Sequence, residues 1–228
     1  MNTAPSLRTQ VKRGAPKASY DPALLHAIVD AAYICQIAFA DAHGVHGIPT
    51  ACWRRGDDLY IHGSNGSRML QRLTEQDCCV TITHLDGLVL ARSAFSHTMN
   101  YRSAMVYGRF EVVGESAKRQ ALADFMAHLV PGRQALVRPG NDKEFAATTV
   151  MRISLAEAVC KVRSGPPTDD EDDMDIATWA GVLPLTQVRG TPVPDPQCTL
   201  PVPGHVRDWV TSGRSFPASA RRNRGRCR

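Results

Sequence analysis

Hydrophobic and polar residues alternate in short runs along much of the chain between residues 33 and 162. Alternation over about four to eight residues, bounded by turn residues, is typical of antiparallel strands. The pattern predicts turns at His43–Gly47 and His84–Gly87. It predicts strands at Tyr33–Phe39, Ile48–Arg54, Leu59–Ile61, Cys78–Thr83, Leu88–Ala94 and Arg102–Val113, and a last strand at Thr148–Val162 that bends near residues 156–158.

Three segments have the helical spacing of apolar residues instead. Asp21 is expected to cap a helix that starts at Pro22, and Ser67 a second helix that ends near Gln76. An amphipathic helix is expected at Ser116–Leu129, and residues 133–147 are expected to form a loop with a short helix. About seven short strands closed by helices predict a mainly β fold, a small β-barrel with peripheral helices.

Composition divides the chain into three parts. Residues 1–19 are polar and basic and are expected to form a flexible arm. Residues 20–185 are expected to form the folded domain, with Asp169–Asp175 as a solvated acidic loop and Ile176–Leu185 docking back onto the barrel. Residues 186–228 are rich in Pro and Arg and are expected to be largely disordered, apart from weak periodicity at Val206–Val210.

The net charge of +5 comes from the end of the chain, where residues 211–228 hold six arginines and no acid. Without those arginines the charge would be −1, so we expect no nucleic-acid partner, except through the arginine-rich tail. The absence of a long apolar run and of a signal peptide predicts a cytoplasmic protein without a membrane partner. The seven cysteines include no CxxC pair and lie at no ligand spacing from a histidine, so we expect no metal site.

The stretch Asp58–Arg68, DLYIHGSNGSR, carries the most chemical information. A short strand runs through small residues into the helix that Ser67 caps, which leaves unpaired backbone N–H groups beside a hydroxyl and a guanidinium. Such a set of donors suits a phosphate monoester. The alternative is an ordinary capped helix with a surface arginine.

Four segments together resemble a known family. They are IPTACWRRGDDLYIHGSNGSRML, THLDGLVLARSAFSHTMNYRSAMVYG, KVRSGPPTDDEDD and WAGVLPL. Their order is similar to that of the pyridoxamine-5′-phosphate-oxidase-like FMN-binding proteins, in particular the flavin-nucleotide-binding or nitroimidazole-resistance-like subgroup. The resemblance covers roughly residues 13–185. It implies an FMN-binding split β-barrel, usually a homodimer with two FMN molecules at the subunit interface.

The resemblance also implies roles for individual residues. Ser67 and Arg68, with Ser64 in the preceding turn, would hold the FMN phosphate, and His62 would lie near the ring. The other implied cofactor-binding residues are Ile48, Pro49, Thr50 and Ala51 along the isoalloxazine edge, Asn100, Tyr101, Arg102 and Ser103 at a strand start, Lys161 and Arg163 at the end of the last barrel strand, and Trp179 as a cover.

Two positions depart from the pattern of the oxidases. Met69 stands where they usually have a lysine after the arginine, so Arg68 would be the main cation of this loop. The oxidases also carry a C-terminal segment with Arg and His that grips the substrate phosphate, and no counterpart follows Leu185. The resemblance therefore implies FMN binding more firmly than oxidation of pyridoxamine phosphate.

The main functional hypothesis is an FMN-dependent oxidoreductase that uses a small-molecule electron donor and acceptor, with His62 as the catalytic candidate. Arg102, Lys161 and Arg163 would stabilise negative charge on the reduced ring. The alternatives for single residues are a satisfied strand-end histidine at position 62 and surface salt bridges to the acidic loop from Arg102, Lys161 and Arg163. The alternatives for the whole protein are a non-catalytic flavin carrier or sensor, or a split barrel with haem or a deazaflavin.

Overall fold

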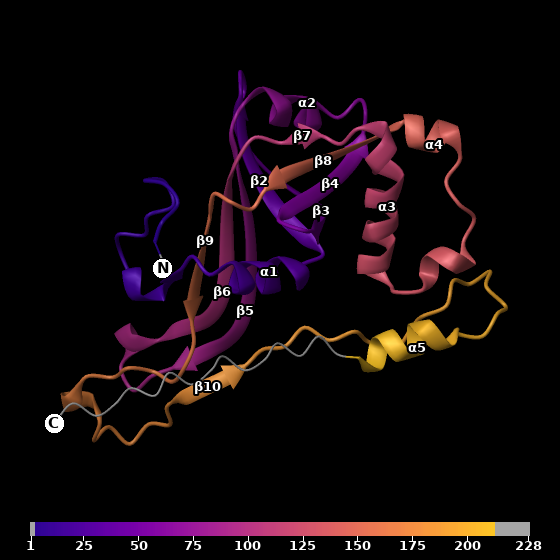
Figure 1. Cartoon of the computed structure of the whole chain (residues 1–228). Helices are drawn as coiled ribbons and strands as arrows, with labels where there is room; N and C mark the ends of the chain where they lie inside the picture. The colour runs from indigo at the N-terminus through magenta and orange to yellow at the C-terminus, as the bar shows by residue number, and fades with distance from the viewer. Residues whose placement is uncertain (1–2, 213–228) are drawn as a thin grey trace.

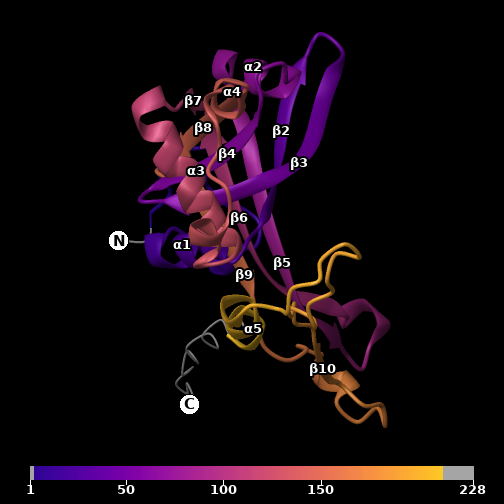
Figure 2. The ribbon, with the colours of Figure 1, turned by 90° about the vertical axis from the view of Figure 1, so that its right-hand side faces the viewer.

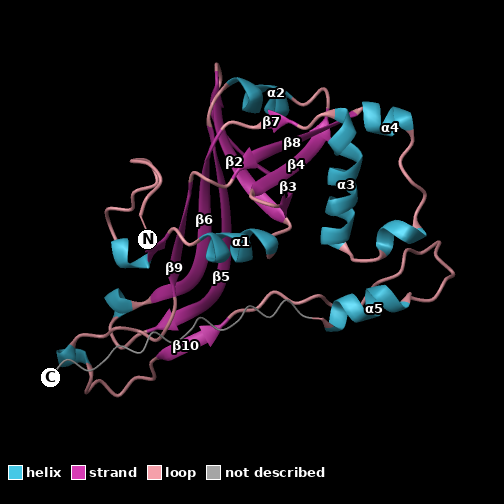
Figure 3. Cartoon of the chain, in the orientation of Figure 1, coloured by secondary structure: helices cyan, strands magenta, loops and turns pink. Residues whose placement is uncertain are grey.

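The computed structural model describes residues 3–212. Within them, ten strands form one largely antiparallel sheet in the order β1-β9-β6-β5-β2-β3-β4-β8-β7, with β10 added to β5 (Figures 1 and 3). The strands are β1 (Ala18–Ser19), β2 (Ile34–Asp41), β3 (Gly44–Arg55), β4 (Asp58–Ser64), β5 (Cys78–Leu90), β6 (Thr98–Gly108), β7 (Glu111–Val112), β8 (Thr148–Ser154), β9 (Ala158–Arg163) and β10 (Gly181–Pro184).

Helices surround this sheet. They are α1 (Pro22–Asp30), α2 (Arg68–Glu75), α3 (Glu115–Leu129), α4 (Asp142–Ala146) and α5 (Gly204–Thr211). Helix α1 packs against β3, β5, β6 and β9, α2 against β2 and β7, and α3 against β3 and β8. None of the helices within residues 3–212 is long and apolar enough to cross a membrane. The predicted arrangement of an antiparallel sheet with peripheral helices is therefore confirmed.

Both predicted helix caps are confirmed. The side chain of Asp21 accepts a hydrogen bond from the backbone N–H of Ala23 at 3.0 Å, and Pro22 takes the first helical position. The hydroxyl of Ser67 accepts a hydrogen bond from the backbone N–H of Leu70 at 3.4 Å. Each cap satisfies a backbone donor of the first turn, which has no partner within its own helix.

The turn predicted at His84–Gly87 is wrong, because β5 runs without interruption from Cys78 to Leu90. A register shift between Leu85 and Gly87 takes up one extra residue, Asp86. The guanidinium of Arg102 on β6 donates two hydrogen bonds of 2.7 Å to the carboxylate of Asp86. The polar residues in this stretch therefore mark a β-bulge within one long strand, where the sequence suggested a turn between two strands.

Two other predicted strands are broken in the structure. The chain predicted as one strand at Arg102–Val113 leaves β6 at Gly108, whose φ of 143° favours glycine, and resumes as β7. The last predicted strand, Thr148–Val162, forms β8 and β9, which lie at distant positions in the sheet. The break coincides with the predicted bend near residues 156–158.

The β2–β3 hairpin is longer than predicted, since its turn is confined to Ala42 and His43. The Asp41 side chain is 2% exposed and accepts hydrogen bonds from the backbone N–H of His43 and from Nε2 of His46, both at 2.8 Å. The ring of His46 also stacks on Phe39, with ring centroids 5.1 Å apart. These hydrogen bonds lower the pKa of Asp41 to about 2, and the one from His46 has the largest effect.

Two apolar clusters form on opposite faces of β4. Ile61 is fully buried in the main core, which the sheet forms with α1 and α2. Tyr60 lies in a smaller core between β3, β4, β8 and α3, where it stacks on Trp53. Adjacent residues of one strand point to opposite faces, so β4 is covered on both sides.

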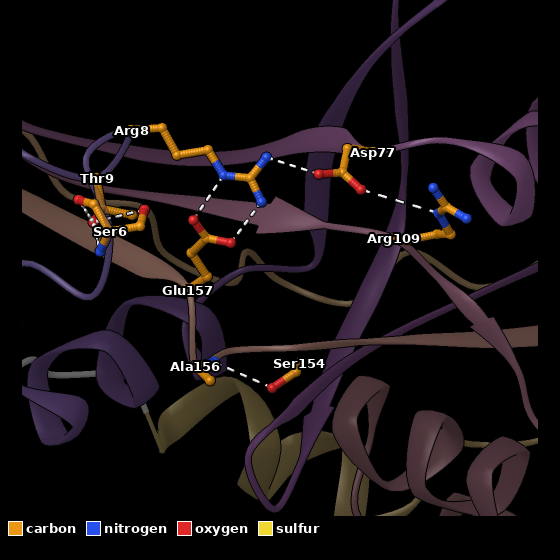
Figure 4. Close-up of polar contacts among 8 residues, drawn as sticks. All are labelled: Ser6, Arg8, Thr9, Asp77, Arg109, Ser154, Ala156 and Glu157. Carbon is orange, nitrogen blue, oxygen red and sulfur yellow. Dashed lines mark hydrogen bonds and ion pairs between the residues drawn. The ribbon is translucent and has the colours of Figure 1, made fainter.

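The N-terminal segment packs on the sheet, in contrast to the flexible arm expected from its composition. Figure 4 shows the guanidinium of Arg8 between Glu157 and Asp77. It donates hydrogen bonds of 2.7 and 2.5 Å to Glu157 and one of 2.8 Å to Asp77. The neighbouring Thr9 is 1% exposed. Arg8 therefore belongs to an ion-pair network on the folded domain. Amino-acid composition alone does not distinguish such a segment from a solvated, flexible tail.

The segment after β9 is also more structured than expected. Ile176–Leu185 docks back as predicted, because β10 pairs with β5. The acidic loop is anchored at Asp169, whose carboxylate accepts hydrogen bonds from the backbone and guanidinium of Arg92 at 2.8 and 3.0 Å. Burial acts to raise the pKa of Asp169, but these hydrogen bonds outweigh it and leave the pKa below its ordinary value.

Residues 186–212 end in α5, the segment where the sequence shows weak periodicity, and α5 lies below the end of α3 (Figure 2). Trp209 donates from Nε1 to the carbonyl of Leu129 at 2.8 Å. The guanidinium of Arg189 lies 3.8 Å above the Trp209 ring and donates to the Tyr33 hydroxyl at 3.0 Å. The predicted disorder of residues 213–228 falls outside the described residues.

We predict that Trp209→Ala destabilises the protein by about 1–3 kcal/mol, the sum of one hydrogen bond and one cation–π contact. This corresponds to a fall in melting temperature of about 2–12 °C for a chain of this size. The matched control is Trp179→Ala, because Trp179 is 67% exposed. Equal shifts for the two variants in a thermal melt would contradict the docking of α5.

We also predict that Asp41 contributes to stability in a pH-dependent way. Its pKa is lowered from 3.8 to about 2 in the folded protein, so its contribution is present above pH 3.8 and is lost as the pH falls to 2. The difference in unfolding free energy between the wild type and Asp41→Asn should shrink over that range in denaturant titrations. A difference that stays constant between pH 6 and pH 2 would show that the carboxylate charge is not involved.

Candidate functional site

The start of α2 is held in place by the turn that precedes it. The side-chain amide of Asn65 donates to the carbonyl of Ala146 at 2.6 Å, and its amide oxygen accepts from the hydroxyl of Thr149 at 2.8 Å. Gly63 lies so close to α2 that a Cβ atom there would be 3.1 Å from Cδ1 of Leu70. The exposed Ser64 accepts from the backbone N–H of Gly66 at 3.4 Å. The turn and the helix start therefore form one rigid unit.

Arg68 extends from this helix start into solvent. Its side chain is 57% exposed, and its Nε lies 3.7 Å from the carboxylate of Asp41. The hydroxyl of Ser67 caps the helix, whose first-turn N–H groups point toward its N-terminal end, and Arg68 is the first residue of the helix. Donors of this kind suit an anionic group, and phosphate binding by Ser67 and Arg68 stays a prediction. Asp41, which sequence reasoning did not place here, adjoins the arginine and is itself hydrogen-bonded to His46.

The predicted isoalloxazine strand has an unpaired edge. Residues 44–51 of β3 pair with β2, whereas residues 52–55 pair with β4. Within the described chain, Ile48–Ala51 has no strand partner on the side away from β2. Pro49, which lacks an N–H group, is tolerated at such an edge. The backbone groups of this edge are therefore available to a ligand, as the prediction requires.

The predicted residues on β6 and β9 lie at the other end of the sheet. Asn100 is buried and accepts a hydrogen bond from Arg163, and its side-chain amide donates to the carbonyl of Gly165 at 3.1 Å. Arg163 also donates to the carbonyls of Gly165 and Pro166, at 3.2 and 3.1 Å. Arg163 is therefore bound to the turn after β9, and its proposed salt bridge to the acidic loop is made by Arg92 instead.

The other predicted residues of this group vary in their surroundings. Ser103 donates to the carbonyl of Lys161 at 3.3 Å, and Tyr101, which pairs with Arg163 in the sheet, is half-buried. The amine of Lys161 lies beside Gly14 of the N-terminal segment. Trp179 is exposed and packs over Gly181 at the start of β10. All belong to the end of the sheet formed by β5, β6, β9 and β10.

The two groups of predicted residues are far apart within one chain. Ala38, Cys79 and Tyr107 lie side by side on β2, β5 and β6. From this row of residues, Asp41 lies in one direction along the strands. Asn100 lies in the opposite direction, toward the start of β6. At about 3.3 Å per residue, this places the two groups about 30 Å apart along the strands. A single chain therefore does not bring all the predicted residues to one flavin mononucleotide.

His62 lies on the face of β4 opposite to Ile61, away from the main core. Its ring is 5.7 Å from Trp53 and 4.7 Å from Phe125 on α3, measured between ring centroids. Burial in these aromatic surroundings lowers the pKa of His62. Its role beside a flavin ring stays a prediction, but its place under α3 defines a second candidate site that sequence reasoning missed. In the sequence, only the helical spacing of apolar residues in α3 indicated that this helix covers one face of the sheet.

Comparison with solved structures reveals two extensive similarities. The flavocytochrome Anf3 from Azotobacter vinelandii is 42% identical, with 90% of this chain and 97% of that chain covered and a TM-score of 0.86. The FAD and haem binding protein from Mycobacterium smegmatis is 35% identical, with 85% and 97% covered and a TM-score of 0.82. A candidate 5-nitroimidazole antibiotic resistance protein from Bacteroides thetaiotaomicron, 23% identical over 64% of this chain and 86% of its own, with a TM-score of 0.53, shares the fold.

Comparison with curated protein sequences finds no match. The family model described as pyridoxamine 5′-phosphate oxidase matches residues 21–162, which include every strand from β2 to β8. This match covers more than half of the chain and agrees with the resemblance predicted from its four sequence segments. The chain therefore belongs to the pyridoxamine 5′-phosphate oxidase family, with the split-barrel type of fold.

Proposed function

We propose that this protein is a flavin-binding redox protein that also binds haem. The observation that carries the proposal is the 42% identity to a flavocytochrome and the 35% identity to a protein that binds FAD and haem, each over most of both chains. These similarities favour the haem alternative over a flavoenzyme with FMN alone. They also favour FAD as the flavin, because FAD is the flavin that the second protein is named for.

The residues at the start of α2 fit the phosphate of a flavin nucleotide. Arg68 supplies an exposed guanidinium, and the first turn of α2 supplies backbone N–H groups. The unpaired edge of β3 at Ile48–Ala51 supplies further backbone donors and acceptors for a heterocyclic ring. When bound, the flavin supplies hydride and single-electron transfer, while the protein positions it and excludes competing reactions.

We propose that the functional unit is a homodimer. The α2 group and the group at Asn100 and Arg163 lie about 30 Å apart along the strands, so they meet at one flavin only if two chains contribute. Large apolar side chains are also exposed on the sheet and its hairpin, including Ile34 at 60% and Val45 at 83%. An exposed apolar face of this kind is typical of a subunit interface.

The dimer is tested by the sedimentation mass of the flavin-loaded protein at micromolar concentration. We expect twice the mass of one 24.9 kDa chain. A charge placed on the exposed face, such as Ile34→Asp, should lower both the dimer fraction and the flavin content. A flavin-loaded species with the mass of one chain would contradict the proposal.

We predict that Arg68→Ala weakens binding of FAD or FMN at least about tenfold, because loss of a charge-assisted contact of about 1.4 kcal/mol changes the dissociation constant by that factor. Riboflavin lacks the phosphate, so its affinity should hardly change. Arg72→Ala, in the next turn of α2 and paired with Glu75, is the matched control. Equal losses for riboflavin and the nucleotides, or no loss for either, would show that the phosphate lies elsewhere.

The proposed function as a whole is tested by the visible spectrum and mass of the small molecules that co-purify with the full chain. We expect a flavin to co-purify with the protein. When the cells are supplied with haem, we also expect the absorption band of bound haem in the spectrum of the purified protein. Turnover with a reduced nicotinamide and a dye acceptor then separates an oxidoreductase from a non-catalytic carrier. A colourless protein that takes up neither cofactor on reconstitution would overturn the proposal.

A further inference from the structure

A cavity of about 310 Å³ lies between α3, the segment that follows it, α4 and the end of β8. Apolar side chains line it, among them Leu122, Phe125, Met126 and Val137. Its volume falls within the range of about 300–1,000 Å³ that is typical of small-molecule and cofactor sites. It belongs to the second, smaller core and lies on the face of β4 opposite to α2, so it is separate from the proposed flavin phosphate site.

His62 lines this cavity, where its ring contacts aromatic side chains. Its Nδ1 atom is buried and has no hydrogen-bond partner among the described residues. A buried polar atom without a partner is unfavourable and calls for an explanation, such as a ligand or ion that is bound in the functional state.

The two arginines that line the cavity have exposed side chains. The side chains of Arg119 and Arg138 are 57% and 66% exposed. Arg138 donates hydrogen bonds of 3.1 and 2.7 Å to the carboxylate of Glu144, and Arg119 donates one of 2.7 Å to Asp142. Each guanidinium therefore already binds a carboxylate, and its remaining N–H groups are donors for a second.

We propose that this cavity binds haem, with His62 as an axial ligand of the iron and Arg119 and Arg138 as the partners of the propionates. The inference rests on the proposed function for the presence of haem and adds the position of its site. A haem has a flat apolar macrocycle, an iron that a neutral imidazole ligates and two carboxylates at one edge. The cavity presents apolar walls, a histidine and exposed arginines, which match these three features.

Another cavity, among the described residues of α1 and β9, fits haem less well. It measures about 340 Å³ and adjoins α1 and β9, and its histidine, His26, is 3.1 Å from the carboxylate of Asp57. None of the described residues that line it is an arginine or a lysine. One other described histidine, His205, has a buried ring nitrogen without a partner, but it lies beside Gly132 and does not line the cavity under α3. His205 is therefore the rival ligand for a test.

The experiment uses the full chain, loaded with flavin and titrated with haem, and follows the Soret band and the magnetic circular dichroism of the iron. We expect His62→Ala to weaken haem binding at least tenfold or to change the axial-ligand signature. Added imidazole should restore the wild-type spectrum by entering the space left by the side chain. His62→Gln, which keeps most of the volume, provides a second variant if His62→Ala does not fold.

Matched controls separate the cavity from its surroundings. His205→Ala should retain the wild-type spectrum. Arg119→Ala and Arg138→Ala should each weaken haem binding several-fold, whereas Arg133→Ala, in the same connecting segment but outside the cavity, should not. An unchanged haem signature in both His62 variants, or its loss in His205→Ala, would overturn the assignment of His62 while leaving the proposed function intact.

The cofactor content of the wild-type protein separates a failure of the haem site from a failure of the proposed function. Uptake of flavin without haem would overturn this inference and the haem half of the proposed function, and would leave the flavin half standing. Failure to bind either cofactor would overturn the proposed function itself.

Discussion

The structure depends on the divergence of β2 and β4 from opposite edges of β3. On one edge, β2 pairs with residues 44–51 of β3, and on the other edge β4 pairs with residues 52–55 alone. Because β4 then continues from His62 to Ser64 beside β8, Ile48–Ala51 of β3 has no partner among the described strands on the edge away from β2. The free edge and the position of α2 after β4 both follow from this divergence, so the candidate flavin site is a consequence of the way the sheet is split.

The same divergence places β4 between two apolar layers. Ile61 points into the main core and His62 points toward α3, so a single strand contributes to both faces. The strand leads to the proposed phosphate site at α2 and lines the α3 cavity, and the two lie on opposite sides of the sheet. Each of the two proposed cofactors would then have its own site beside one strand.

Sequence reasoning identified the local features well. The caps at Asp21 and Ser67 follow from the chemistry of single residues and their immediate neighbours, and the structure confirms both. Its errors were in stretches where local composition and tertiary contacts disagree. Asp86 indicates a turn by composition, yet Arg102 on the adjacent strand binds it within a β-bulge. Arg8 indicates a solvated arm, yet it lies between two carboxylates from distant segments.

The sequence by itself determined the family, the antiparallel strands, the capped start of α2 and the exposed arginine that follows the cap. These depend on periodicity and on contacts between residues close in the chain. Only the tertiary structure decided that Arg163 binds Asn100 and that Asp41 adjoins Arg68. It also decided that His62 lies under α3 beside Phe125. The physical reason is that strand order and register bring these residues together, and both are set by the packing of the whole sheet, which no local pattern records.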